Sequence, residues 1–288
     1  MIEDTKDLIL EIQRNFPKLS KGQKLIAQYI VEHYDKAAFM TASKLAKIVG
    51  VSESTVVRFA NALGFDGYPQ LQKGLQDIIK IKLTTVQRVE MSRDYFGEEA
   101  ILKKMFKSDI DNIRATQEAM DFKTFQEVVD KILKAETIYI IGLRSSTALA
   151  QYLGFYLNMI VNNVKIVGYG ISDIFEQMLR VSDKDLVIGL SFPRYSNRTV
   201  EALKYAKEQN ATIVAITDSF MSPIYGLSNY CLTAKNNMAS FVDSLVAPLS
   251  LINALILAVG MREKEEITAY FNKLEDLWDK HNVYDNEK

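Results

Sequence analysis

The spacing of hydrophobic residues divides the chain into two regions with different predicted structures. Up to about residue 80, apolar positions recur three or four residues apart, which is the helical period. After residue 135, short continuous apolar runs alternate with helical patterns, which is typical of a buried, mainly parallel sheet with helices on both faces. The five predicted strands are Thr137–Gly142, Val164–Val167, Asp185–Leu190, Thr212–Thr217 and Tyr230–Thr233.

Helical periodicity also appears before, between and after these strands. It covers residues 98–134 and then the segments Ser145–Ile160, Ser172–Val181, Thr199–Gln209 and Phe241–Val259. Residues 81–97 lack it and hold two threonines, a charged stretch and Gly97. We therefore predict an all-α domain over residues 1–80, a linker over 81–97 and an α/β domain over 98–288, with a mainly parallel five-stranded sheet flanked by helices.

Residues 41–64 have the layout of a helix-turn-helix. Thr41 or Ser43 can begin a short helix, Gly50 suits the tight turn, Val51 can fill the corner, and Ser52 can cap the second helix. The first helix is expected to bury Leu45 and Ala46, and the second Val56, Val57, Ala60 and Leu63.

The polar face of that second helix has the chemistry of a DNA reader. Short hydroxyls at a helix N-terminus suit phosphate oxygens, and arginine and asparagine match the edges of bases in a major groove. Lysines on the preceding helix can neutralise phosphates. A small helical bundle with a solvated polar face is the alternative. The predicted DNA-binding residues are Lys44, Lys47, Ser52, Ser54, Thr55, Arg58 and Asn61.

Charge is distributed unevenly in a way that fits this interpretation. The net charge of the whole chain is −1, but residues 14–82 hold 11 basic and 5 acidic side chains, whereas residues 83–288 hold 23 basic and 27 acidic ones. A basic N-terminal segment joined to an acidic remainder of the chain is typical of a DNA-binding domain followed by a domain that does not bind DNA.

Polar loops follow two of the predicted strands in the second domain. Each combines hydroxyl groups with arginine at a point where a strand ends and a helix begins, and such a point suits an anionic ligand. A third polar loop, Thr217-Asp218-Ser219, follows the fourth strand. The predicted effector-binding residues are Gly142, Arg144, Ser145, Ser146, Ser191, Arg194, Ser196 and Thr199.

These motifs, with Gly64-Phe65-Asp66-Gly67-Tyr68 after the helix-turn-helix, resemble the RpiR family of bacterial regulators over nearly the whole chain. Residues 120–260 are similar to a sugar isomerase (SIS) domain, which has a flavodoxin-like sheet. The resemblance implies regulation of sugar or related carbon metabolism, operator DNA and a phosphorylated sugar or related metabolite as partners, and a homodimer or tetramer. It assigns Gly142, Ser145, Ser146, Ser191 and Ser196 to the effector.

One loop departs from the family pattern. Many relatives have Ser-x-Ser-Gly-x-Thr, whereas Pro193 and Arg194 stand here in place of the second serine and the glycine. Direct charge from Arg194 can replace wrapping of a phosphate by the backbone. This favours a different phosphate pose, or a sugar acid or cyclitol as the ligand.

A sugar-phosphate isomerase is the alternative function. Aldose–ketose isomerisation needs a general base, and no histidine lies within residues 34–280, which leaves Glu136, Glu176 and Glu201 as candidates. We expect no catalytic residues, metal site or cofactor, since the only histidines are His33 and His281 and the only cysteine is Cys231.

The sequence also bears on the protein's location. The N-terminus lacks a signal-peptide pattern, and the single cysteine suits a reducing compartment. The longest apolar stretch, Leu245–Met261, is interrupted by polar residues and is shorter than the ~20 residues of a membrane span. We expect a cytoplasmic protein without membrane contact.

Overall fold

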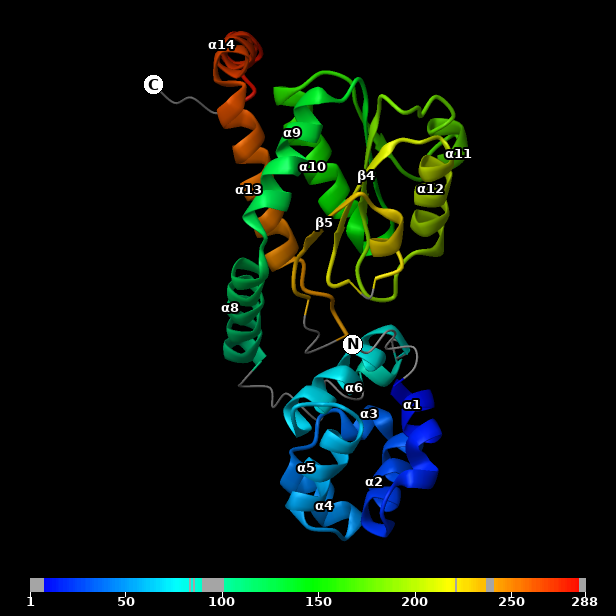
Figure 1. Ribbon diagram of the computed structural model, residues 1–288. Helices are drawn as coiled ribbons and strands as arrows, with labels where there is room; N and C mark the ends of the chain where they lie inside the picture. The colour runs from blue at the N-terminus through cyan, green and yellow to red at the C-terminus, as the bar shows by residue number, and fades with distance from the viewer. Residues whose placement is uncertain are drawn as a thin grey trace. The chain divides into compact units, whose positions relative to one another are not determined.

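The computed structural model describes residues 8–82, 84, 86–89, 101–220, 222–236 and 241–284. The chain divides into two units, Met1–Met91 and Ser92–Lys288 (Figure 1). Most of the predicted linker, residues 81–97, lies outside the described residues, although Lys82 still belongs to the helix that begins at Tyr68 and residues 86–89 are also helical.

The first unit consists of helices around one apolar core. Its buried side chains include Ile26, Leu45, Val56, Phe59 and Leu71, which come from four different helices. The elements are α1 (Leu8–Asn15), the 3₁₀ turn η2 (Phe16–Lys18), α2 (Lys21–Glu32), α3 (Tyr34–Ala37), α4 (Ala42–Val49), α5 (Glu53–Ala62) and α6 (Tyr68–Lys82).

The predicted turn between α4 and α5 is confirmed in its details. Thr41 caps α4 by accepting a hydrogen bond from the backbone N–H of Lys44, and Gly50 ends that helix with a φ of +76°. Ser52 then caps α5 by accepting from the N–H of Thr55. The prediction that Val57 points inward is wrong, since its side chain is 38% exposed. Val56, Ala60 and Leu63 are buried as predicted, and Phe59 is buried with them, which leaves Val57 on the outer face of α5.

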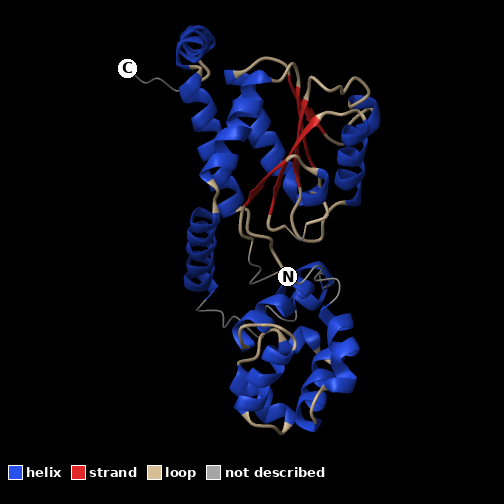
Figure 2. Ribbon diagram, in the orientation of Figure 1, coloured by secondary structure: helices blue, strands red, loops and turns tan. Residues whose placement is uncertain are grey.

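The second unit is built on a five-stranded sheet in which every strand pair is parallel (Figure 2). The strand order is β2-β1-β3-β4-β5, which is the flavodoxin-like order. All five predicted strands are confirmed to within one residue, as β1 (Ile138–Gly142), β2 (Val164–Val167), β3 (Leu186–Leu190), β4 (Thr212–Thr217) and β5 (Tyr230–Thr233).

Helices cover both faces of this sheet. Alternate strand residues pack to opposite sides, so that Ile140 contacts one apolar cluster and Tyr139 the other. The first cluster includes side chains of α9 (Phe122–Lys134), α10 (Thr147–Ile160) and α13 (Val246–Arg262). The second includes those of α11 (Ile174–Gln177) and α12 (Asn197–Glu208). Short 3₁₀ turns lie at η4 (Arg144–Ser146) and η5 (Tyr225–Leu227), and α8 (Ile101–Ala119) and α14 (Lys264–His281) complete the unit.

Two predicted helices differ from the structure by several residues. The helix predicted over Ser172–Val181 is only the four residues of α11, because the chain continues through turns in which Val181 N–H donates to the carbonyl of Met178. The helix predicted over Phe241–Val259 begins at Val246. Pro248 is its third residue, where the missing N–H would have had no partner within the helix.

In the part of the chain that the structure describes, no single helix is long and apolar enough to cross a membrane; α13 and α14 meet the criteria only together, across a bend of 106°.

Candidate functional site

The predicted DNA-binding residues lie on the outer surface of α4 and α5. All seven side chains are exposed except Thr55, which is half-buried. Three hydroxyls gather at the start of α5, where Ser52 Oγ lies 2.9 Å from Ser54 Oγ and 2.8 Å from Thr55 Oγ1. Arg58 Nε donates to the carbonyl of Ser54 at 3.3 Å, which draws the guanidinium group back toward this cluster. The first turn of α5 therefore presents hydroxyl groups and one cation together.

The N-terminus of α2 holds α5 in place, which the sequence analysis did not anticipate. A Cβ atom on Gly22 would lie 3.2 Å from Thr55 Cγ2, so the glycine allows the two helices to approach closely. Gln23 accepts from the N–H of Ser20 and donates through Nε2 to the carbonyl of Arg58 at 3.3 Å. Nothing local to residues 41–64 reveals these contacts, because they join residues more than thirty positions apart.

The two predicted effector loops follow β1 and β3, which are adjacent strands. From β1 the chain first adds β2 on one side and then returns to add β3 on the other side of β1. The order in which strands are added therefore reverses between β1 and β3. Parallel strands place their carboxyl ends at one edge, and a crevice at such a reversal is the usual ligand position in this architecture. The structure thus brings both loops to the position where a ligand is expected.

The loop after β1 depends on a close approach of backbone to backbone. A Cβ atom on Gly142 would lie 2.7 Å from the carbonyl oxygen of Ser146. Arg144 has a φ of +60°, and its side chain is exposed together with that of Ser145. Ser146 is buried. The loop therefore presents Arg144 and Ser145 to solvent, while Gly142 and Ser146 shape it.

The loop after β3 repeats part of this arrangement. Arg194 is exposed and has a φ of +64°, so both effector loops carry an arginine in the left-handed region, which non-glycine residues rarely adopt. Ser191 is buried, and Ser196 is half-buried and caps α12 by accepting from the N–H of Thr199. Thr199 is fully buried, and its Oγ1 has no hydrogen-bond partner in the described part of the chain. Of the four predicted residues, Arg194 is the most accessible.

A hydrogen-bond network anchors the second loop to the end of β4. Tyr195 donates its hydroxyl to Asp218 Oδ1 at 2.8 Å, and Thr217 Oγ1 donates to the carbonyl of Ser191 at 2.6 Å. Asp218 is buried, and its carboxylate also accepts from Ser219. The sequence marked Asp218 as part of a polar strand end, but it gave no sign that Tyr195, next to the predicted Arg194, bonds to it.

The three glutamates considered as isomerase bases are engaged elsewhere. Glu136 precedes β1, at the sheet edge opposite the effector loops, and forms an ion pair with Lys184 at 3.3 Å. Glu176 accepts from the N–H of Asp173 at 3.0 Å, and Glu201 pairs with Lys204 at 3.0 Å on the exposed side of α12. Each of the three carboxylates is thus held by a cation or a backbone N–H of its own surroundings.

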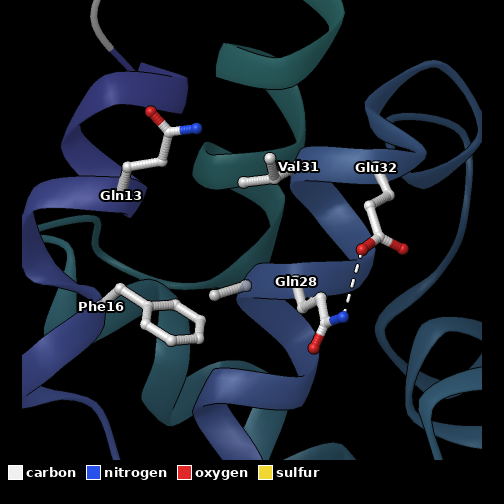
Figure 3. Close-up of a pocket in the computed structure, with 6 residues that line it drawn as sticks. Gln13, Phe16, Gln28, Val31 and Glu32 are labelled. Carbon is white, nitrogen blue, oxygen red and sulfur yellow. Dashed lines mark hydrogen bonds between the residues drawn. The ribbon is translucent and has the colours of Figure 1, made fainter.

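An apolar hollow lies in the first unit, apart from the predicted residues (Figure 3). Gln13 and Phe16 line it from one side, and Gln28, Val31 and Glu32 line it from α2. Gln28 Nε2 donates to Glu32 Oε1, one turn further along α2, at 3.1 Å. It contains none of the residues assigned to DNA or effector.

Comparison with known proteins matches the two units separately. The rpiR-family helix-turn-helix domain matches residues 6–80, and the SIS domain matches residues 131–258. An HTH-type transcriptional regulator of Haemophilus influenzae is 27% identical over 267 residues, which are 88% of this chain and 90% of that protein.

Two solved structures share the fold. The sugar isomerase domain of an RpiR transcription factor from Sphaerobacter thermophilus covers 62% of this chain and 99% of its own length, with a TM-score of 0.59 and 26% identity. The NanR protein of Vibrio vulnificus, solved in complex with ManNAc-6P, covers 97% of this chain and 100% of its own length, with a TM-score of 0.59 and 22% identity. With a helix-turn-helix domain of the rpiR type followed by a SIS domain, and with relatives named as transcriptional regulators rather than enzymes, this chain belongs to the RpiR family of transcriptional regulators.

Proposed function

We propose that this regulator controls genes of sugar or related carbon metabolism and is itself controlled by a phosphorylated, sugar-like effector bound between the carboxyl ends of β1 and β3. One observation carries the proposal. Arg144 and Arg194 are both exposed, both have positive φ, and both lie in loops that follow adjacent strands. Strained backbone at two matching positions is typical of a site shaped for a ligand.

The chemistry of the two loops defines the class of effector. Guanidinium groups bind phosphate or carboxylate through paired hydrogen bonds, and Ser145 adds an exposed hydroxyl. A phosphorylated sugar or a phosphorylated sugar acid satisfies these groups. The NanR protein, which has the same fold, was solved with ManNAc-6P, a ligand of this class.

The DNA-binding unit supplies the output. In this proposal Arg58 and Asn61 read base edges of an operator, while Lys44, Lys47 and the hydroxyls at the start of α5 contact phosphates. The regulator acts as a homodimer or tetramer in the cytoplasm, where Cys231 stays reduced. An effector controls DNA binding only if it binds one arrangement of the assembly better than another.

The test is a thermal-shift screen of the full chain against phosphorylated sugars, sugar acids and cyclitols, followed by DNA-binding assays with each hit. A ligand that binds only the native state raises its stability, so a true effector raises the melting temperature and changes operator affinity. Arg194→Ala should abolish the shift. Arg198→Ala is the matched control, because Arg198 lies four residues away and is engaged by Asp173 and the ring of Phe175.

The outcomes separate the two halves of the proposal. A hit that Arg194→Ala abolishes and Arg198→Ala preserves supports the effector site. A hit that is insensitive to Arg194→Ala and to Ser145→Ala would place the effector elsewhere. Operator binding that is unaffected by Arg58→Ala would refute the DNA-reading role of α5, for which we expect a loss of about 1–3 kcal/mol.

A further inference from the structure

Helix α2 begins against the first turn of α5, the helix to which we assign the reading of DNA. A Cβ atom on Gly22 would lie 3.2 Å from Thr55 Cγ2 and 3.7 Å from Val51 Cγ1. Lys21 directly precedes this glycine and is the first residue of α2. The backbone of Lys21 therefore lies beside the residues that open α5, although the two helices begin more than thirty positions apart in the sequence.

The side chain of Gln23 fixes this arrangement. Its Nε2 donates to the carbonyl of Arg58 at 3.3 Å, and its Oε1 accepts from the backbone N–H of Ser20 at 2.9 Å. One side chain thus joins the entry into α2 to the second turn of α5. Lys21, which follows Ser20, is held in a constant position relative to Arg58.

The charge on Lys21 is not neutralised by the part of the chain that the structure describes. Lys21 is exposed and forms no ion pair with the described residues, whereas Nζ of Lys24 lies over the ring of Phe16 at 5.7 Å from its centre. Glu53 is the only acid on α4, on α5 and on α2 before its last residue, and it too has no ion pair among the described residues. The surface around the start of α5 is therefore basic.

A DNA backbone is the partner that this arrangement of charge fits. An α-helix with its side chains is about 10–12 Å across and the major groove is about 12 Å wide, so a helix that enters the groove fills it. Elements packed against that helix then lie beside the phosphates that border the groove. Helix α4, with Lys44 and Lys47, and the start of α2, with Lys21, are such elements.

We propose that Lys21 binds a phosphate of the DNA backbone beside the bases that α5 reads, so that the DNA-binding surface includes the start of α2. The proposal rests on the proposed DNA-reading role of α5 and adds a residue that lies outside the helix-turn-helix segment. Phosphates carry no base identity. Lys21 therefore contributes equally to the binding of an operator and of unrelated DNA.

The salt dependence of DNA binding tests this contact without knowledge of the operator. The affinity of the full chain for a short duplex of arbitrary sequence is measured by fluorescence anisotropy between about 50 and about 200 mM salt. Each phosphate contact adds about 0.9 to the slope of log K against log salt concentration. Lys21→Ala should lower the slope by about 0.9 for each DNA-binding unit engaged, and Lys21→Arg should restore it.

Lys36→Ala is the matched control, because it removes the same charge from the same unit. Lys36 is exposed and lies in α3, which follows the far end of α2, a helix of 12 residues and therefore about 18 Å long. Lys36→Ala should keep the slope of the wild type. Because Lys21 is exposed, Lys21→Ala should also keep the melting temperature of the wild type.

The outcomes separate this contact from the reading role of α5. An unchanged slope in Lys21→Ala would overturn the contact, as would equal decreases in Lys21→Ala and Lys36→Ala, which would show an effect of net charge alone. A lower slope in Lys21→Ala, with a preference for operator over unrelated DNA that survives Arg58→Ala, would keep the contact and refute base reading by Arg58. A wild-type chain that binds no DNA at the lowest salt concentration would overturn both.

Discussion

Substitution of Gly142 by alanine tests the geometry of the effector loop directly. The added Cβ atom would lie 2.7 Å from the carbonyl oxygen of Ser146 and 3.1 Å from Cβ of Ala150. Non-bonded heavy atoms pack best at about 3.5–4.0 Å, so the first turn of α10 must move away from β1 by several tenths of an ångström. The atom in the way belongs to the backbone, which cannot rotate aside as a flexible side chain would.

The expected cost follows from this displacement. Overpacking in a buried position destabilises a domain by about 1–3 kcal/mol. In a domain of this size each kcal/mol lowers the melting temperature by roughly 2–4 °C. The same movement displaces Arg144 and Ser145 from their positions beside β3, so effector affinity should fall together with stability.

Urea unfolding measures the effect, followed by the fluorescence of Trp278, the only tryptophan of the chain, which lies in α14 of the same unit. Gly168→Ala is the matched control. Gly168 directly follows the neighbouring strand β2, and a Cβ atom there would meet no atom within 4 Å. Gly168→Ala should change the free energy of unfolding by less than about 0.5 kcal/mol. Equal stabilities of the two variants would refute the close approach of Gly142 to Ser146.

Three further predictions concern single side chains. Ser52→Ala should lower the stability of the first unit by ~1 kcal/mol in urea unfolding, since Ser52 caps α5 through the N–H of Thr55, and Ser52→Asp should preserve the cap. Burial raises the pKa of Tyr68 to about 12, so this phenol ionises at a lower pH in the unfolded state than in the native state. The first unit should therefore lose stability from about pH 10 towards pH 12. Tyr68→Phe should remove that loss in alkaline unfolding experiments. Burial, with a smaller effect of the Asp218 carboxylate, raises the pKa of the Cys231 thiol to about 12, so mass spectrometry should find slow alkylation by iodoacetamide at about pH 8 in the native protein and fast alkylation in urea.

The strands were predictable because parallel strands buried on both faces require continuous apolar runs, and runs of four to six residues are too short for buried helices. The segment Ile174–Val181 shows where the same reasoning fails. Ile174, Met178 and Val181 are buried with helical spacing, but successive turns place them on one side just as well as a helix does. Hydrophobic periodicity predicts which side chains point inward. It does not determine whether the backbone that carries them is helical or a series of turns.

The two sites differ in how far local chemistry determines them. Thr41, Gly50 and Ser52 each act on backbone groups within four residues, so their roles were accessible from the sequence. The bond from Tyr195 to Asp218 spans 23 positions and exists only because β3 and β4 are neighbours. The positive φ of Arg144 and Arg194 is likewise imposed by surrounding structure, since neither side chain favours it.

Helix α8 shows why a correctly predicted element can still be misjudged. Its apolar residues repeat with the helical period, and the ordinary inference is that this face packs against the domain that contains the helix. The contacts of Asp109 and Thr116 reverse that inference, because they anchor the polar face and leave Phe106 in solvent. Periodicity alone does not show which face of a helix packs against its own domain.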